Sequence, residues 1–575
     1  MPPTFVSFLV QYLQLSFVGT SLFQPTAVDT KNHITYLGTR AYGVEKFLNI
    51  PYGQDTSGKK RFANPEAYKF SANVSTYDAT VAGPICPQPG DTDGMSEDCL
   101  RLKVARPMGV KAGDKLPVMV FIYGGGLFSG GINDPTNEPD GLILQSVENG
   151  LPVVHVAMNY RLSIFGFALS EPLRTQKSLN VGLKDQRLAL EWVQQNVAYF
   201  GGDPERVTIY GQSSGALSVT LQILAYGGSK PIPFHGAIMQ STALEPGSTS
   251  NITADSYNAV VKLAGCDAGK DPQSAASLDC LRSLPFQKLL NITITQHDST
   301  GDQNDGDIYL PAVDGDFLPL PSSELATKGL FPKIPVMVGW TDRDAAPFTH
   351  SDIISSTDAR NFIHLLFPGL TDNTLTTLLS LYPNTNFAPA PAANLSTEFY
   401  RAAEIFRDIL FTCPSFLFGY AMAQKYRAAN ETPAVYYYDQ NQTVKGYVTP
   451  SELGVIHTSE FPYTFANFGA FNGSGELHPT ADDFELQKRQ SRTWSGFANG
   501  GKASLDGRET LEGWQSAYGS SQSGMFDASM YVIGGPHSGL SPLDGKGTNP
   551  ELEKQQLRER CSFLNGADVI AQLQY

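Results

Sequence analysis

A serine between two glycines, directly after a short apolar segment, is the strongest chemical signal in this chain. Residues 206–216 read Arg-Val-Thr-Ile-Tyr-Gly-Gln-Ser-Ser-Gly-Ala, which is Gly-x-Ser-x-Gly with Ser213 at its centre. Gly211 and Gly215 lack the Cβ atoms that would clash in a sharp strand-to-helix turn, so the backbone can hold Ser213 strained with its Oγ exposed. Because such a turn is costly unless it presents a reactive group, we expect Ser213 to be a nucleophile.

A second glycine-rich segment lies upstream and could supply hydrogen-bond donors. Residues 121–126 read Phe-Ile-Tyr-Gly-Gly-Gly, an apolar segment followed by three glycines. A serine nucleophile needs N–H groups aimed at the oxyanion of its tetrahedral intermediate, and such a loop precedes the nucleophile in α/β-hydrolases. A flexible turn and a phosphate loop are alternatives, but no Gly-Lys-Ser/Thr follows and the acidic partner of dinucleotide-binding loops is missing. We expect the donors to be Gly125, Gly126 and Ser214.

The elements that must position these residues read as alternating strands and helices. A helix is expected over residues 184–199, where Leu188, Trp192, Val193 and Val197 share one face. Short apolar runs, typical of buried parallel strands, cover residues 118–123, 153–158, 207–210, 237–239 and 335–339, with 435–438 as a further candidate. This rhythm predicts an α/β fold with a mostly parallel central sheet and helices on both faces. Residues 388–393, Ala-Pro-Ala-Pro-Ala-Ala, are interpreted as a surface loop, so we expect one domain over residues 28–575.

Composition excludes several classes of function. The 575 residues are 41% hydrophobic and 17% charged, which is typical of a globular protein, and the formal net charge is −15. A chain this acidic has little non-specific attraction for nucleic acid or for an anionic membrane surface. No His/Cys cluster has the spacing of metal ligands, so neither a metal nor an organic cofactor is predicted.

Several features favour an extracellular protein. Residues 5–17 are mostly apolar but too short and polar to span a bilayer; they resemble the core of a secretion signal without its basic flank. We therefore interpret residues 1–27 as a signal peptide or a disordered N-terminus, and no later apolar segment could anchor the chain. The cysteine count is even, at six, and Asn-x-Ser/Thr glycosylation sequons occur at Asn73, Asn251, Asn291, Asn394, Asn430, Asn441 and Asn472.

The motifs together resemble the type-B carboxylesterase/lipase family, which includes fungal extracellular lipases and cholinesterases. Beyond the serine turn, the resemblance rests on Ser96–Leu100, Tyr123–Gly126, Asn159–Arg161, Asp185–Gln186, Trp192–Gln194, Phe200–Pro204, Trp494 and Phe497–Ala498. It covers roughly residues 28–570. It implies an α/β-hydrolase fold with long insertions, and a catalytic triad in the chain order serine, acid, histidine.

The resemblance implies that His457 is the general base. Residues 453–460 read Leu-Gly-Val-Ile-His-Thr-Ser-Glu, which is similar to the histidine loop of the family. Glu460 lies on the same local loop and is interpreted as a structural partner. His350 is the main rival base, but its setting, Phe-Thr-His-Ser, matches no catalytic segment.

The acid is where this chain departs from the family. The family has a strand, then Gly, four residues and Glu-Gly, whereas residues 338–345 read Val-Gly-Trp-Thr-Asp-Arg-Asp-Ala, with Asp344 at the glutamate position. Aspartate is shorter by one methylene, so its loop must lie closer to His457. Asp342 is the rival acid, two residues away, whereas Asp314 and Asp316 lie in a segment that the family uses structurally.

Three residues near the predicted site differ from those usual in the family. Gln212 and Ser214 replace the Glu and Ala that flank the nucleophile, and Leu127 stands where the family often has an aromatic residue. The loss of a carboxylate at 212 removes a negative charge and argues against cationic choline esters. Leu127 is expected to alter the pocket for the leaving group or the acyl chain.

The disulfides implied by the family order bear on substrate class. They pair Cys86 with Cys99, Cys266 with Cys280, and Cys413 with Cys561, out of the many pairings that six cysteines allow. In lidded lipases of the family the first disulfide loop is long and forms an amphipathic flap. Here residues 87–98 are polar and rich in Gly and Asp, so the loop has no apolar face for a lipid interface.

These observations predict a secreted serine carboxylesterase whose partner is a small-molecule ester. Soluble esters of short to medium chain length are favoured over emulsified fat. A lipase or sterol esterase is the alternative within enzymes, and a non-catalytic adhesion or binding member of the family is the alternative outside them.

Overall fold

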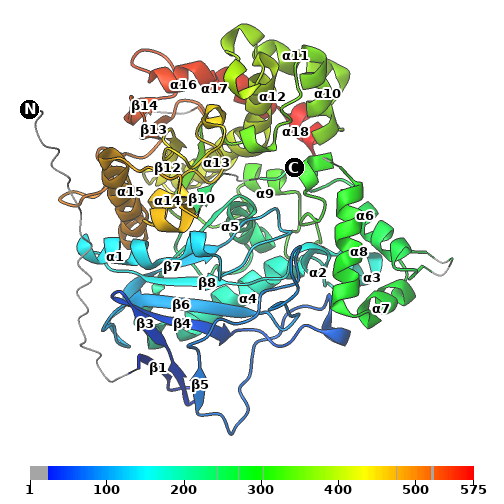
Figure 1. Cartoon of the computed structure of the whole chain (residues 1–575), viewed down its shortest axis with the longest axis vertical. Coiled ribbons are helices and arrows are strands. Elements are labelled where there is room, and N and C mark those ends of the chain that lie inside the picture. The colour runs from blue at the N-terminus through cyan, green and yellow to red at the C-terminus, as the bar shows by residue number, and fades with distance from the viewer. Residues whose placement is uncertain are drawn as a thin grey trace, which may run out of the picture.

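A mixed sheet runs through the centre of the molecule and carries the predicted site at one edge (Figure 1). The computed structural model describes residues 24–241, 244–267, 269, 271–301, 303–473, 475–519 and 524–575. Within them the sheet has eleven strands, ordered β14-β13-β12-β11-β10-β9-β7-β8-β6-β4-β3. Their bounds are β3 (Thr39–Ala41), β4 (Val44–Pro51), β6 (Arg101–Pro107), β7 (Leu116–Ile122), β8 (Val154–Met158), β9 (Gly202–Gln212), β10 (Gly236–Gln240), β11 (Val336–Thr341), β12 (Val435–Gln440), β13 (Ser529–Ile533) and β14 (Gly539–Pro542).

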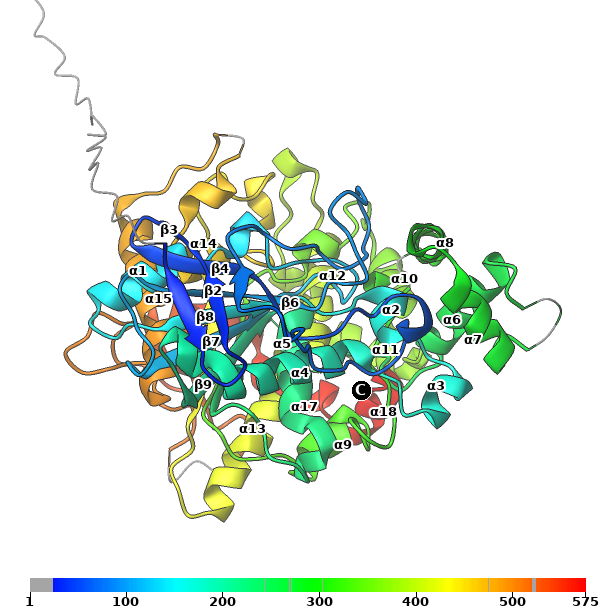
Figure 2. The ribbon, with the colours of Figure 1, turned by 90° about the horizontal axis from the view of Figure 1, so that it is seen from below.

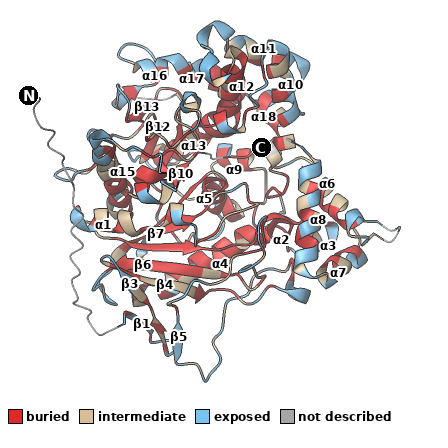
Figure 3. Ribbon diagram, viewed as in Figure 1, coloured by how far each residue is buried: buried red, intermediate tan, exposed pale blue. Residues whose placement is uncertain are grey.

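The central strands are parallel, and antiparallel pairs lie at the two ends of the sheet. Strands β8, β7, β9, β10, β11, β12 and β13 pair in parallel, whereas β3, β4, β6 and β14 join antiparallel. Every predicted strand segment falls within one of these strands or overlaps it. Each residue of β8, β10, β11 and β12 is buried (Figure 3), as expected for parallel strands covered on both faces.

Helices cover both faces of this sheet, as predicted. Helices α1 (Asp140–Glu148) and α15 (Ala481–Gly500) pack together on one face, and α4 (Val181–Asn196), α5 (Ser214–Leu224) and α13 (Cys413–Ala428) lie on the other (Figures 1 and 2). The predicted helix over 184–199 is α4, which ends at Asn196 and continues as a 3₁₀ turn, Val197–Phe200.

Two groups of helices extend beyond the sheet and account for the length of the chain. Helices α6 (Ile252–Leu263), α7 (Ala275–Ser283) and α8 (Phe286–Ser299) project at one side (Figure 1). A second group lies beyond the β14 end of the sheet: α10 (Ser356–Leu366), α11 (Asp372–Leu381), α12 (Thr397–Arg407), α16 (Pro550–Gln555), α17 (Leu557–Leu564) and α18 (Ala567–Leu573). Residues 388–393 form an exposed loop with a short 3₁₀ turn, as predicted.

The N-terminal boundary differs from the prediction. Strand β1 (Thr26–Asp29) pairs with β2 (Ile34–Leu37), which pairs with β5 (Thr76–Asp78) in a separate small sheet. Ala27 is buried, so ordered structure begins inside the segment that we assigned to a signal peptide or disordered terminus. The sequence did not indicate β1 because its four residues alternate between exposed and buried positions over too short a stretch to recognise. The rest of that prediction, residues 1–23, lies outside the described residues.

Covalent links and buried ion pairs hold the loops that surround the sheet. Disulfides join Cys86 to Cys99, Cys266 to Cys280, and Cys413 to Cys561, the pairing that the family resemblance implied. Arg161 and Asp185, from two of the family motifs, form a buried bidentate pair with N–O distances of 2.8 and 2.7 Å, and Asp185 also accepts the backbone N–H of Arg161. Such a pair is expensive to break because each partner would leave an uncompensated buried charge.

Candidate active site

Ser213 occupies a strained turn between β9 and α5. Its φ and ψ are 60° and −135°, a conformation that non-glycine residues rarely adopt. The turn is tight: a Cβ on Gly215 would lie 2.2 Å from the carbonyl oxygen of Ile122, and one on Gly211 would lie 2.5 Å from the carbonyl carbon of Gly215. Both positions therefore require glycine, because neighbouring backbone atoms approach them too closely for a side chain. The turn is also held by the Ser213 N–H, which donates to the carbonyl of Gln240 at 2.9 Å.

The predicted oxyanion loop faces the start of α5. Gly125 and Gly126 have φ values of 105° and 62°, which favour glycine. The backbone N–H of Leu127 donates to the Ser214 hydroxyl at 3.0 Å, which ties the loop to the first residue of the helix. The N–H of Ser214 lies in the first turn of α5, where no intrahelical acceptor exists and the helix dipole favours negative charge.

The acid and the histidine are in direct contact. His457 Nδ1 lies 2.6 Å from Asp344 Oδ1, and both side chains are buried. Asp344 Oδ2 accepts the backbone N–H of Thr341 at 3.0 Å, which fixes the orientation of the carboxylate. An ionised carboxylate accepts only, so this bond places the ring proton on Nδ1 and leaves Nε2 as the basic atom.

The loop of Asp344 is bound to the histidine loop through the backbone. The N–H of Arg343 donates to the carbonyl of Val455 at 2.9 Å, two residues before His457. This contact brings the shorter aspartate within reach of the imidazole, as the missing methylene requires. Asp342, the rival acid, is half-buried and faces Arg343, with an N–O distance of 3.5 Å.

The predicted residues meet in one cavity of about 320 Å³. Five of the six residues assigned to the triad and the oxyanion donors line it: Gly125, Gly126, Ser213, Ser214 and His457. The sixth, Asp344, contacts His457 from outside the cavity. Further lining residues are Gln212, Glu245, Asp307, Phe348, Leu410, Phe411 and Thr458. This arrangement holds a nucleophile, a base with its acid and N–H donors around one space.

The His457 ring is held by two aromatic residues and by Gln212. Phe411 stacks on the ring with centroids 5.1 Å apart, and Phe348 meets it edge-on at 5.2 Å. Gln212 Nε2 lies 3.3 Å from His457 Nδ1 and 3.0 Å from His457 Nε2, so its amide contacts the face of the ring. Within the described residues Asp344 is thus the short hydrogen-bond partner of the ring, Gln212 and the two aromatic residues hold its faces, and Ser213 shares the cavity.

Glu460, which we interpreted as a structural partner, lies behind Asp344. It accepts from Gln240 Nε2 at 3.2 Å, and Gln240 Oε1 accepts from Trp494 Nε1 at 3.1 Å. Burial, reinforced by the nearby Asp344 carboxylate, raises the pKa of Glu460 to about 7. Since Gln240 also holds the Ser213 N–H, this network connects the backs of the serine and acid loops.

The rival residues lie elsewhere. The His350 ring packs against Phe362 with centroids 5.0 Å apart and does not line the catalytic cavity. Asp314 caps its own turn by accepting the N–H groups of Asp316 at 2.9 Å and of Leu318 at 2.8 Å. The Asp314 carboxylate is therefore engaged in holding its own turn, and neither Asp314 nor Asp316 lines the catalytic cavity.

A wide groove of about 990 Å³ opens beside the catalytic cavity. Gly125, Gln212 and Thr458 line both spaces, so the two are continuous. Residues 87–98, all described, form turns without a helix, and Gln88 anchors them through bonds of 2.8 Å to the backbone N–H and carbonyl of Gly130. The short disulfide loop thus borders the groove instead of covering it as an apolar flap.

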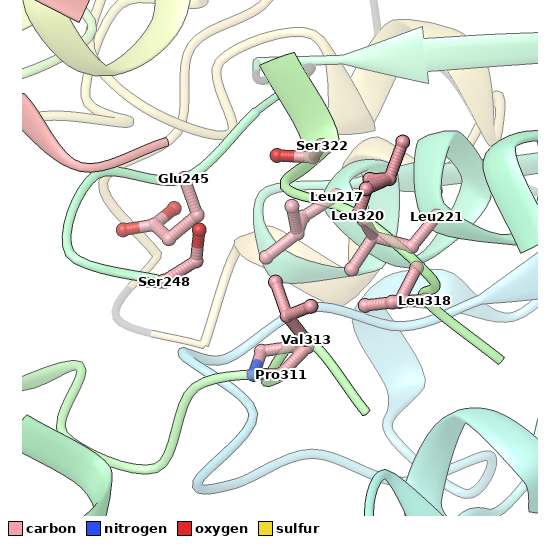
Figure 4. Close-up of a pocket in the computed structure, with 9 residues that line it drawn as sticks. All are labelled: Leu217, Leu221, Glu245, Ser248, Pro311, Val313, Leu318, Leu320 and Ser322. Atoms are coloured by element: carbon pink, nitrogen blue, oxygen red, sulfur yellow. The ribbon is translucent and has the colours of Figure 1, made fainter. Parts of the chain in front are cut away.

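A smaller pocket lies beside α5 (Figure 4). Leu217 and Leu221 of the helix face it, together with Val313, and Glu245 and Ser248 come from the loop opposite. Glu245 lines this pocket and the catalytic cavity, which places its carboxyl between the two.

The glycosylation sequons differ in exposure. The asparagines exposed at the surface are Asn73, Asn251, Asn291, Asn394, Asn430 and Asn472. Asn441 is only partly exposed, and its Nδ2, the atom that would carry a glycan, is buried. The structure therefore argues against Asn441, which follows directly after β12.

In the described part of the chain, no group of three or more His, Cys, Asp or Glu residues could hold a metal ion. No helix in the same part of the chain is long and apolar enough to cross a membrane.

Sequence reasoning missed two residues of the site. Asp307 lines the cavity from the segment after α8, and Gln240 supports Ser213 from the end of β10. Neither belongs to a motif with a chemical meaning. The position of Gln240 at the carboxyl end of the strand next to β9 was the one available signal, because the carboxyl ends of parallel strands share an edge.

A serine on a strand-to-helix turn at the carboxyl edge of a mostly parallel sheet is the arrangement of an α/β-hydrolase. The chain matches the carboxylesterase family over residues 31–529 and belongs to it.

Known proteins resemble the chain over almost its full length. It is 44% identical over 558 residues to a secreted lipase of Arthroderma benhamiae, covering 96% of each chain. It is 36% identical over 523 residues to the inactive carboxylesterase-like protein VdtD of Byssochlamys spectabilis, covering 86% of this chain and 87% of the other. The crystal structure of EstA from Aspergillus niger has a TM-score of 0.77 at 25% identity and covers 96% of this chain and 99% of its own.

Proposed function

We propose that this protein is a secreted serine carboxylic-ester hydrolase that forms an acyl-enzyme on Ser213. The observation that carries the proposal is the 2.6 Å contact between Asp344 and His457, in a cavity that also holds Ser213 and the glycine loop. Its family supports carboxylic-ester hydrolysis as the reaction.

In the first half-reaction Ser213 Oγ attacks the ester carbonyl while His457 Nε2 takes its proton. Asp344 holds the Nδ1–H tautomer and stabilises the imidazolium that forms. Gly125, Gly126 and Ser214 donate to the oxyanion. His457 then gives the proton to the leaving alcohol, and water releases the acyl group by the same steps in reverse order.

The Gln212 side chain lies beside the His457 ring in the ligand-free protein. Its Nε2 lies 3.3 Å from His457 Nδ1 and 3.0 Å from His457 Nε2, so it contacts the ring face and not the in-plane lone pair that receives the Ser213 proton. Hydrogen bonds at catalytic groups are often loose in ligand-free enzymes and tighten in the substrate complex. An ester bound in the cavity would complete the bond from Ser213 to His457.

The dimensions of the site favour soluble esters of short to medium chain length. The catalytic cavity of about 320 Å³ lies at the small end of ligand sites. The polar loop over residues 87–98 supplies no apolar surface for a lipid interface.

The test compares wild type with Ser213→Ala on p-nitrophenyl butyrate. The variant should keep the fold and lose turnover, and wild-type turnover by the variant would refute the assignment. A series of p-nitrophenyl esters of rising chain length should show the highest kcat/KM for short to medium acyl groups.

A lipase is the second candidate, because the relative from Arthroderma benhamiae is named a secreted lipase. The same name supports secretion of this chain. Hydrolysis of tributyrin below and above its solubility limit separates the two candidates. We expect no jump at the interface, whereas a jump would favour the lipase.

A further inference from the structure

The catalytic cavity contains a carboxyl group that the proposed mechanism does not use. Asp307 lines the cavity with Ser213 and His457, and a Cβ built on Gly126 would lie 2.4 Å from its Oδ1. The carboxyl is therefore pressed against the loop that receives the carbonyl oxygen of the substrate. Among the residues that the structure describes, no side chain or backbone N–H donates to this carboxylate.

The cavity offers the Asp307 carboxylate little positive charge to stabilise its ionised form. The other titratable side chains that line the cavity are Glu245 and His457, and Phe348, Leu410 and Phe411 supply apolar walls. Burial raises the pKa of Asp307 to about 7, with His457 opposing the shift. The side chain is half-buried, so water can reach the carboxyl in the ligand-free protein, and an acyl group that displaces this water must itself supply a donor.

The geometry also distinguishes the two ends of the ester. The leaving alcohol must lie by His457 Nε2, which protonates it, and this atom contacts Gln212. Gln212 and Thr458 border the wide groove, whereas Asp307 lines the catalytic cavity alone. The alcohol therefore extends into the groove, and the acyl group enters the cavity that holds Asp307.

We infer that Asp307 is a specificity-determining residue that selects acyl groups with a hydrogen-bond donor, a hydroxyl or an ammonium, close to the scissile carbonyl. Because Asp307 abuts Gly126, the donor must sit within a few bonds of the carbonyl carbon, as in a 2- or 3-hydroxyacyl ester. Acyl groups with their own carboxylate should be rejected, because the described lining side chains include two carboxyls and no Lys or Arg. The inference rests on the proposed function.

The test measures kcat/KM for three methyl esters by titration of the released acid at pH 8. Methyl butanoate is the plain substrate, methyl 3-hydroxybutanoate adds the donor, and monomethyl glutarate adds an anion. The proteins are wild type, Asp307→Leu, Asp307→Asn and Asp279→Asn, the last being a matched change at an exposed carboxylate on α7.

We expect wild type to prefer the hydroxy ester over the plain ester, and Asp307→Leu to reduce this ratio by about tenfold or more. Asp307→Asn should raise kcat/KM for monomethyl glutarate by about tenfold, because it removes a like charge without changing the shape of the side chain. Asp279→Asn should match wild type on all three esters.

A hydroxy-to-plain ratio that Asp307→Leu changes by less than twofold would overturn the inference. So would an Asp307→Asn enzyme that still rejects the anionic ester. Labelling of Ser213 by a fluorophosphonate separates this failure from that of the proposed function. If Ser213 is labelled and methyl butanoate is hydrolysed, only the role of Asp307 is refuted; if neither occurs, both proposals are.

Discussion

The substitution Asp344→Asn should inactivate the enzyme by trapping the wrong tautomer of His457. In wild type, Asp344 Oδ2 accepts the Thr341 N–H at 3.0 Å while Oδ1 faces His457 Nδ1 at 2.6 Å. An asparagine must keep its oxygen toward the Thr341 N–H, so its NH₂ group points at Nδ1. His457 must then accept on Nδ1 and carry its proton on Nε2, where it cannot take the proton of Ser213.

The expected loss is about 10⁴-fold in kcat, equivalent to about 5 kcal/mol of transition-state stabilisation. The assay is hydrolysis of p-nitrophenyl butyrate, with circular dichroism to show that the fold is intact. Asp342→Asn is the matched control, two residues away and facing Arg343, and should stay within about twofold of wild type. The reasoning is refuted if Asp344→Asn keeps more than about a tenth of wild-type kcat, or if Asp342→Asn suffers the large loss instead.

Three further predictions concern residues around the site. Gln212→Glu places a carboxylate beside the His457 ring, whose Nε2 lies 3.0 Å from Gln212 Nε2 in wild type. Because the negative charge favours the imidazolium, the acid limb of the pH–kcat/KM profile should move up by about one pH unit, and an unmoved limb would contradict the contact. Burial raises the pKa of Glu460 from 4.5 to about 7, so the folded state holds this proton more tightly and loses stability as pH rises between those values. Wild type should therefore lose up to about 3 kcal/mol of unfolding free energy between pH 5 and pH 8 in urea titrations, and Glu460→Gln should lack this loss; the same pH dependence in both proteins would argue against it. Arg161→Ala leaves the buried Asp185 unpaired and should cost about 3–5 kcal/mol in the same assay, whereas a cost below about 1 kcal/mol would show that the pair is dispensable.

Much of the fold was predictable because its signals are local. Apolar runs such as residues 153–158 mark parallel strands that are buried on both faces, and Gly211 and Gly215 mark a turn that no other residue fits. The antiparallel ends of the sheet and β1 were missed, because strands as short as Thr26–Asp29 carry too little alternation to recognise.

The residues of the site likewise fall into those that local sequence identifies and those that depend on the fold. Ser213 and the glycine loop could be located from the residues themselves, since the backbone conformation of each requires glycines that are visible in the sequence. His457 and Asp344 needed a resemblance to known proteins, because they lie on loops 113 positions apart whose contact depends on the fold. Asp307 and the Gln240–Glu460 bond are consequences of tertiary packing and have no local pattern.

The central claim is that Ser213 is the activated nucleophile of an ester hydrolase, and labelling with a fluorophosphonate tests it most directly. One relative is named inactive, so the test also separates an enzyme from a binding member of the family. We expect a single covalent adduct, mapped to Ser213 by peptide mass spectrometry, with turnover abolished in proportion to labelling and no adduct in Ser213→Ala. An unlabelled wild-type protein, or an adduct on another residue with Ser213 untouched, would contradict it.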